Sequence, residues 1–339
     1  MHAMKLKIAV AMLGGALSLG FLGGSAVADP LKVRVGWANM PGHMIPVLFS
    51  KPEILKHYGE SYTVEPIKFA GTSAMVAALA ADQIDASVMS PGAMALASIN
   101  AGLDLTMFAD NQQDGEGHVQ TYFLVKKDSG INSPADLKGK RVATNVQGSA
   151  MDVSLRIMLT KAGLDPSRDV SIVEVPFASA PEMLKEGKVD FAMLVQPFAR
   201  PALESGDYKQ LTNQSDVYGG LIQVTFLAAK HDWLDANRAA MADFTEDYVR
   251  AMRWFINPDN RTEALKIIAD YMNVPVEKVS IQFTKDDFVR DPWGVPRVDG
   301  VQRVIDGARS IGFISQDYKI APDHVDLSLV EEARRRIEQ

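Results

Sequence analysis

Short runs of alternating apolar and polar residues recur along the chain, separated by amphipathic stretches. The first run, Leu31–Trp37, places Val33, Val35 and Trp37 on one side with a period of two, which predicts a half-buried β-strand. Further strands are expected over 63–69, 86–89, 105–110, 121–126, 141–144, 171–175, 191–195 and 221–228. Helices are expected over 44–56, 71–81, 91–101, 149–161, 180–185 and 198–204, near 133–136, and from about 236 to the end. This alternation predicts an α/β fold with largely parallel sheets.

An internal repeat suggests that two similar units follow one another. Residues 79–85 match residues 184–190, because each segment is a helix end, a turn and an Asp before a short apolar strand. Each of those strands is followed by a proline, Pro91 or Pro197, that can occupy the first turn of a helix. The repeat therefore predicts two α/β units of related design.

The restart of the pattern after each unit predicts where the chain crosses between them. We expect crossings near 118–122 and 218–221, both short and both at strands, which suits a hinge of few residues. The predicted organisation is a leader over 1–28, a first part of lobe 1 over 29–119, lobe 2 over 120–219, and a return to lobe 1 with C-terminal helices over 220–339.

The first 28 residues have the pattern of a secretory signal peptide. Lys5 and Lys7 precede an apolar stretch over 8–22, and Ala26-Val27-Ala28 forms a small-residue cleavage site. A membrane anchor is the alternative, but the stretch is short, rich in glycine and ends in small residues. We therefore expect cleavage after Ala28, a mature chain beginning at Asp29, and a periplasmic location.

Composition narrows the possible chemistry. The apolar share of 47% and the charged share of 23% are those of a globular protein. A formal net charge of −7 argues against general nucleic-acid binding, which needs a concentrated positive field. The chain has no cysteine, which excludes disulfides, cysteine zinc sites, iron–sulfur clusters and thiol nucleophiles.

Familiar catalytic and metal-binding motifs are absent from the sequence. It contains no H-x-x-H, H-E-x-x-H or G-x-S-x-G pattern and no Walker A loop. The histidines after the leader are scattered, and His43 is the most interesting because it follows the first strand. We therefore predict no catalytic residue, no metal and no cofactor.

Small polar residues stand where predicted strands give way to helices. These junctions are Gly71-Thr72-Ser73, Ser90, Gln147-Gly148-Ser149 and Gln196 before a proline. Helix N-termini carry free N–H groups and partial positive charge, and in an open α/β sheet they lie at the edge where ligands bind. Ordinary helix capping explains any one of them. Four such junctions in two units favour a shared ligand cleft.

Three positions have a more specific interpretation. Gly148 lets the backbone approach a ligand closely, and Ser149 can offer a hydroxyl and a backbone N–H or can simply cap its helix. Trp37 and Phe177 follow strand ends and could be core residues or an apolar wall for an organic ligand.

Several segments resemble the periplasmic solute-binding proteins of the nitrate, sulfonate and taurine ABC transporter family. Residues 69–85, from Phe-Ala-Gly-Thr-Ser-Ala to Gln-Ile-Asp, are similar to the family's first-domain signature, and 123–142 to its entry into the second domain. Residues 184–190, followed by Gln196-Pro197, resemble a second family segment. At Val195-Gln196-Pro197 the chain departs from the Trp-Glu-Pro or Trp-Asp-Pro that members often carry, which weakens inference of the usual ligands.

The resemblance implies a two-lobed, type II-like periplasmic binding protein fold with two crossings and a ligand cleft between the lobes. It also implies ligand capture without chemical conversion, delivery to an ABC permease in the inner membrane, and, we expect, a monomer. Trp37, Phe177 and Met40 with no securely placed arginine favour an organic anion with an apolar body, a sulfonate or an aliphatic or aromatic carboxylate. Matching positions to the family gives the expected ligand contacts Trp37, Asn39, Thr72, Ser73, Ser90, Gln147, Gly148, Ser149, Phe177 and Gln196.

Two other functions remain open at this point. A ligand-sensing periplasmic subunit of a membrane receptor would share the cleft and differ only in its partner. An enzyme like those that make the thiamine pyrimidine would share the fold, but that branch relies on a cysteine-containing motif, and this chain has no cysteine.

Overall fold

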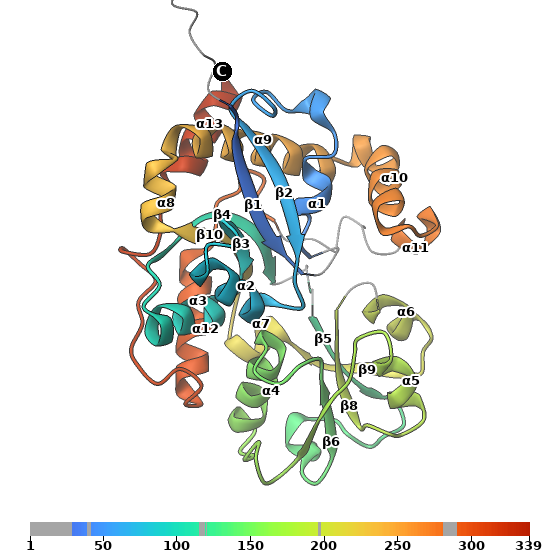
Figure 1. Cartoon of the computed structure of the whole chain (residues 1–339). Helices are drawn as coiled ribbons and strands as arrows, with labels where there is room; N and C mark the ends of the chain where they lie inside the picture. The colour runs from blue at the N-terminus through green and yellow to red at the C-terminus, as the bar shows by residue number, and fades with distance from the viewer. Residues whose placement is uncertain (1–28, 39–41, 115–118, 120, 196–197, 281–289) are drawn as a thin grey trace, which may run out of the picture.

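Two α/β lobes, one above the other in Figure 1, make up the computed structural model, which describes residues 29–38, 42–114, 119, 121–195, 198–280 and 290–339. Each lobe is built on a five-stranded sheet. The sheet of lobe 1 contains β1 (Leu31–Trp37), β2 (Tyr62–Lys68), β3 (Ala86–Met89), β4 (Leu105–Asp114) and β10 (Ile222–Lys230). The sheet of lobe 2 contains β5 (Thr121–Lys126), β6 (Arg141–Thr144), β7 (Ser171–Glu174), β8 (Phe191–Val195) and β9 (Tyr208–Asn213).

Both sheets are mixed, with one reversed strand in each. The orders are β2-β1-β3-β10-β4 and β7-β6-β8-β5-β9, and β10 and β5 run antiparallel to both of their neighbours. These two strands are the ones with which the chain enters a lobe from the other. Such a strand starts at the edge where its parallel neighbours end, so it must run against them. The α/β prediction is confirmed, and the expectation of largely parallel sheets is corrected to mixed ones.

Helices cover both faces of each sheet (Figure 1). Those of lobe 1 are α1 (Ile45–Leu48), α2 (Thr72–Ala80), α3 (Pro91–Ala101), α8 (His231–Ala236), α9 (Arg238–Ile256), α10 (Arg261–Met272), α11 (Val276–Ser280), α12 (Val298–Ser310) and α13 (Ser328–Glu338), with 3₁₀ turns at η1 (Pro52–Ile54) and η3 (Pro258–Asn260). Those of lobe 2 are α4 (Ala150–Lys161), α5 (Ala180–Lys185), α6 (Ala199–Glu204) and α7 (Gln214–Tyr218), with a 3₁₀ turn at η2 (Pro134–Leu137).

Three clusters of buried apolar side chains fill the space between sheets and helices. One lies between the sheet of lobe 1 and α1, α9, α10 and α13, and one lies under α5 and α6 in lobe 2. The third covers the other face of lobe 1 and continues through α4 into lobe 2. At this joint Gly307 of α12 packs against Tyr218, so closely that a Cβ on Gly307 would stand 2.8 Å from the ring atom Cε1. The lobes therefore share a packed core at one side.

The helix expected over 44–56 is present only in part, and a single continuous helix there is wrong. Helix α1 ends at Leu48, and a separate 3₁₀ turn, η1, begins at Pro52. A proline disfavours the helical region for the residue before it, and Lys51 accordingly adopts φ −119° and ψ 75°. Strand β4 continues to Asp114, four residues further than expected, and strand β9 and helix α7 were not anticipated.

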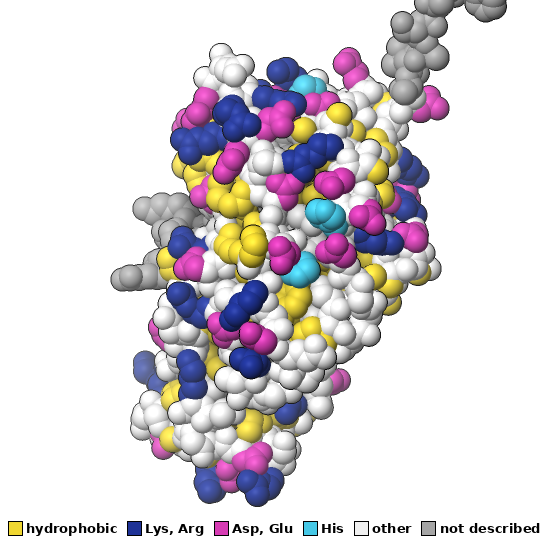
Figure 2. Space-filling view, turned by 90° about the vertical axis from the view of Figure 1, so that its left-hand side faces the viewer, with side chains coloured by type: hydrophobic (Ala, Val, Ile, Leu, Met, Phe, Trp, Pro, Cys, Tyr) yellow, Lys and Arg dark blue, Asp and Glu magenta, His cyan; other side chains and the backbone are white. Residues whose placement is uncertain are grey.

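The surface shown in Figure 2 mixes acidic and basic side chains without gathering one sign of charge into a large patch. Across the described ranges, no helix combines the length and the apolar character that crossing a membrane requires.

Candidate functional site

A cavity of about 320 Å³ lies between the lobes, where the strands of the two sheets end. Lobe 1 lines it with Ala38, Gly42, His43, Ala70, Gly71, Thr72, Ser90, Gln112, Val224 and Thr225. Lobe 2 lines it with Thr121, Asn145, Ser149, Ala150, Met151, Phe177, Val195 and Phe198. None of these described lining residues is acidic, a lysine or an arginine. The cavity therefore offers hydroxyl, amide and imidazole groups together with an apolar surface.

Helices α2, α3 and α4 begin at this cavity. Ser90 caps α3 by accepting a hydrogen bond from the Ala93 N–H, and its Oγ lies 3.3 Å from Thr72 Oγ1. Ser149 caps α4 by accepting from the Asp152 N–H at 3.3 Å and donates to Asn145 Oδ1 at 2.8 Å. The N-terminal ends bring partial positive charge and N–H groups to the cavity wall.

His43 stands in the wall of lobe 1 as a buried, neutral imidazole. Its Nδ1 accepts a hydrogen bond from the Ala38 N–H at 3.0 Å. Burial, helped by the positive charge of Arg290, lowers the pKa of His43 to about 3. At neutral pH the ring therefore carries its single proton on Nε2.

A hydrogen-bonded network lies directly behind this wall. Arg290 donates to Gly42 O at 2.9 Å and to Asn111 Oδ1 at 3.5 Å. The Nδ2 group of Asn111 donates to Gly42 O at 3.0 Å and to Thr225 Oγ1 at 2.7 Å. The pKa of the Arg290 guanidinium is lowered by burial. These contacts fix the orientation of two cavity-lining residues, Gly42 and Thr225.

Asp110 lies deeper in the same region. Burial raises its pKa to about 6, although Gln223 Nε2 and the Asp291 N–H donate to its two oxygens. Within the described parts of the chain, no group of three or more histidine, aspartate or glutamate side chains is arranged to hold a metal ion.

The structure brings together only part of the expected ligand contacts. Thr72, Ser90, Ser149 and Phe177 line the cavity. Ser73 and Gly148 border a small space of about 30 Å³, which shares Thr72, Ser90 and Ala150 with the main cavity. The backbone N–H of Gly148 donates to Asp152 Oδ2 at 2.9 Å.

Four other expected contacts do not line the cavity or lie outside the described residues. Gln147 is exposed, and its backbone N–H donates to Glu174 Oε1 at 2.8 Å. Trp37 is buried in the core of lobe 1, edge-on to Tyr271 at 6.1 Å between ring centroids, and its indole nitrogen has no hydrogen-bond partner among the described residues. Asn39 and Gln196 lie outside the described residues.

Several lining residues were not among the expected contacts, above all His43, Gln112, Asn145, Met151 and Thr225. The sequence pointed to His43 through its position just after the first strand. Gln112 and Thr225 also gave a weak signal: Gln112 belongs to the polar end of β4, and Thr225 is a polar residue within the mostly apolar β10.

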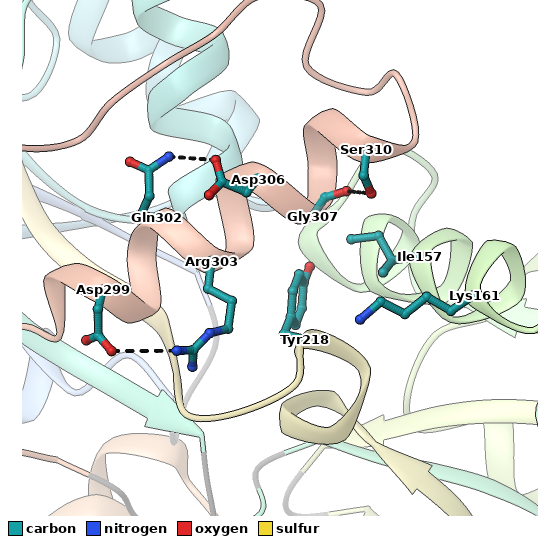
Figure 3. A pocket seen from close by; sticks show the side chains of 9 residues that line it. All are labelled: Ile157, Lys161, Tyr218, Asp299, Gln302, Arg303, Asp306, Gly307 and Ser310. Atoms are coloured by element: carbon teal, nitrogen blue, oxygen red, sulfur yellow. Dashed lines mark hydrogen bonds and ion pairs between the residues drawn. The ribbon is translucent and has the colours of Figure 1, made fainter.

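A second depression, of about 540 Å³, opens on the surface where α4, α7 and α12 meet (Figure 3). Its charged and amide side chains are engaged with neighbouring groups. Gln302 donates to Asp306, Arg303 pairs with Asp299 and donates to Leu221 O, and Lys161 donates to Val217 O. The interlobe cavity is the better candidate, because both lobes contribute strand ends and helix N-termini to it.

Two lobes on mixed sheets, with a cavity where their strand ends meet, define the two-lobed periplasmic binding protein fold. The chain belongs to the NMT1-like family, whose model matches residues 26–269. The resemblance seen in the sequence is thereby confirmed.

Named relatives fall in the same class. The chain is 26% identical over 272 residues to a putative aliphatic sulfonates-binding protein of Escherichia coli K12, a match that covers 79% of this chain and 80% of that protein. It is 25% identical over 158 residues to the nitrate/nitrite binding protein NrtA of a Nostoc species, covering 44% of this chain but only 34% of NrtA. The chain therefore spans about a third of the length of that relative.

The fold matches a solved structure over most of its length. The periplasmic aliphatic sulphonate binding protein SsuA from Escherichia coli superposes with a TM-score of 0.67 at 19% identity, covering 88% of this chain and 92% of that one. These three relatives are binding proteins, not enzymes.

Proposed function

We propose that this chain captures a small organic anion, a sulfonate or an aliphatic or aromatic carboxylate, between its lobes and delivers it to the membrane permease of an ABC importer. The observation that carries the proposal is the interlobe cavity of about 320 Å³, a volume suited to a solute of this size. The names of the relatives, which bind nitrate or sulfonates, support an anionic ligand.

The lining supports a solute with an anionic group at one end and an apolar body at the other. Helix N-termini and neutral donors hold anions in proteins without a basic residue in contact. Met151, Phe177, Val195 and Phe198 supply an apolar surface on the side of lobe 2. A bare inorganic anion would leave this surface without a partner, whereas an organic body would cover it.

Delivery and location form the second part of the proposal. Residues 1–28 act as a signal peptide removed after Ala28, and the protein works in the periplasm. The intact mass of the exported protein tests this, since it should begin at Asp29. Permease and ATPase genes beside the gene support import, whereas a neighbouring sensor kinase would favour a receptor subunit.

Native mass spectrometry of protein purified without denaturation tests the binding function. We expect an additional mass from a co-purified solute, lost in Val195→Trp because the indole fills the cavity. Val146→Trp is the matched control, because Val146 belongs to the same lobe but is 52% exposed. A solute retained by Val195→Trp would show that the cavity is not the binding site.

Lobe closure follows from capture between lobes, as far as the closed state binds the solute better. Small-angle scattering with the identified solute should show a smaller radius of gyration than without it. Unchanged scattering at saturation would count against closure.

A further inference from the structure

The imidazole of His43 is a fixed donor toward the cavity. Its Nδ1 is occupied by the Ala38 N–H, so the proton of the neutral ring is on Nε2. Nε2 makes no hydrogen bond to another described residue, and the side chain lines the cavity while only 7% exposed. The Nε2–H group is therefore available to the cavity, where an acceptor oxygen of a bound solute can take its hydrogen bond.

The hydroxyl of Thr225 is also oriented as a hydrogen-bond donor toward the cavity. Asn111 Nδ2 donates to Gly42 O, which can only accept, and this sets which end of the amide faces Thr225. The same Nδ2 donates to Thr225 Oγ1 at 2.7 Å, so the hydroxyl accepts there and must donate elsewhere. No described residue accepts its proton, and Thr225 lines the cavity at 6% exposure. Two groups of one wall therefore offer hydrogens to the cavity: His43 Nε2–H, which has no lone pair, and Thr225 Oγ1–H, which keeps one lone pair beside its hydrogen.

A buried positive charge lies behind both donors. Arg290 donates to Gly42 O and to Asn111 Oδ1, so it contacts the wall segment next to His43 and the amide that orients Thr225. Asp110, which is buried nearby and is not a lining residue, offsets part of this charge. Electrostatic interactions act strongly in such a poorly solvated interior.

We infer that His43 Nε2–H and Thr225 Oγ1–H bind the oxyanion head group of the solute, with Arg290 behind them, and so select acids over their uncharged amides. This assignment rests on the proposed function and adds the residues that determine ligand class. An amide would replace one acceptor oxygen by an NH₂ group, which cannot accept a hydrogen bond from either donor.

Isothermal titration calorimetry with matched pairs of probes tests the assignment. The pairs are benzoate and benzamide, hexanoate and hexanamide, and 1-butanesulfonate and 1-butanesulfonamide, so that each pair shares one apolar body. We expect the acid of at least one pair to bind and its amide to bind at least about tenfold more weakly.

Variants of Thr225 test the residue. Thr225→Val keeps the shape and removes the hydroxyl, and should weaken binding of that acid about 5- to 150-fold. Thr225→Ser keeps the donor and should restore affinity to within about twofold. Thr106→Val is the matched control, because Thr106 is a buried threonine of the same sheet that bonds to His231 and does not line the cavity.

The outcomes separate this assignment from the proposed function. An amide that binds as tightly as its acid, or a Thr225→Val protein with unchanged affinity for the acid, would overturn the assignment and leave capture in the cavity standing. If no probe binds, the co-purified solute decides. A solute with an oxyanion that Thr225→Val loses supports the assignment, and any other solute overturns it. Protein that binds no probe and carries no solute would reject the proposed function as well.

Discussion

The two walls of the interlobe cavity differ in how they are built. The wall of lobe 1 contains polar groups held in place by a buried network that reaches Arg290. The wall of lobe 2 is more apolar, since Met151, Phe177, Val195 and Phe198 belong to its lining. Under the proposed function, lobe 1 would orient the solute and lobe 2 would cover it.

The core of lobe 1 also contains more aromatic contacts than the core of lobe 2. In lobe 1 the ring of Phe244 lies against Phe49, Tyr62, Phe108 and Tyr248, with centroids 5.2 to 6.4 Å away. In lobe 2, among the described residues, Phe191 has one such neighbour, Phe123, at 5.8 Å. We expect the rigidity of the polar wall to depend on this larger aromatic cluster.

The largest effect should come from the aromatic cluster. Phe244→Ala should lower the free energy of unfolding by about 3–5 kcal/mol, because it leaves a cavity and removes the ring contacts. For Phe191→Ala, the loss in the free energy of unfolding should lie at or below the lower end of that range. Urea denaturation of both variants checks the comparison, and a greater loss in lobe 2 would contradict it.

Lowering the pH should reduce the free energy of unfolding through His43, which lies in the lobe 1 wall of the cavity. Its pKa is about 3 in the folded protein against about 6.5 in the unfolded chain. The unfolded chain therefore binds more protons below pH 6.5, and stability falls as the pH is lowered from there toward 3. Between pH 7.5 and 4.5 the contribution is on the order of 2 kcal/mol. In His43→Gln, the free energy of unfolding measured by urea denaturation should fall less between the two pH values than in the unmodified protein. An equal fall in both proteins would count against a buried neutral imidazole.

An apolar contact from lobe 2 should matter next. Phe177→Ala removes part of the cover over the solute and should weaken affinity about tenfold, or about 1.4 kcal/mol. Phe313→Ala is the control, because Phe313 is also half-buried but lies outside the cavity lining. Calorimetry with the co-purified solute measures both, and equal affinities in the two variants would refute the role of the lobe 2 wall.

The smallest effect concerns Ser149. Its hydroxyl donates to Asn145 and caps α4, and its backbone N–H donates to Val146 O. Ser149→Ala should therefore cost the ligand-free protein about 1 kcal/mol and change affinity less than about twofold. Thermal unfolding beside calorimetry separates the two roles. A large loss of affinity would show that the hydroxyl turns to the solute on binding.

Part of this site could be predicted from the sequence because it depends only on residues that are neighbours in the chain. Thr72, Ser90 and Ser149 stand at strand-to-helix junctions, and a general rule places such junctions at the ligand edge of an α/β sheet. Trp37 illustrates the limit of that rule. Its side chain follows the parity of Val33 and Val35 into the core, whereas Ala38, one position later, lines the cavity.

The rest depends on contacts between distant residues. Thr225 and Asn111 are 114 residues apart, and they meet only because β10 returns beside β4. The role of His43 likewise depends on Arg290, far along the chain. Neither spacing nor periodicity carries this information, since a threonine in an apolar strand has the same local pattern whether or not an amide stands behind it.

The contact between Gly307 and Tyr218 has a consequence at a distance. Gly307 belongs to α12 of lobe 1, and the added Cβ would also approach Ile157 of α4 at 3.1 Å. A single methyl group there would force the two lobes apart at this joint and, with the lobe closure proposed above, would change the balance between open and closed populations. Apparent affinity scales with the fraction of molecules in the competent state. Under the proposed function, the retention of the solute would thus depend on a position outside the cavity lining, without any change in the groups proposed to recognise the ligand.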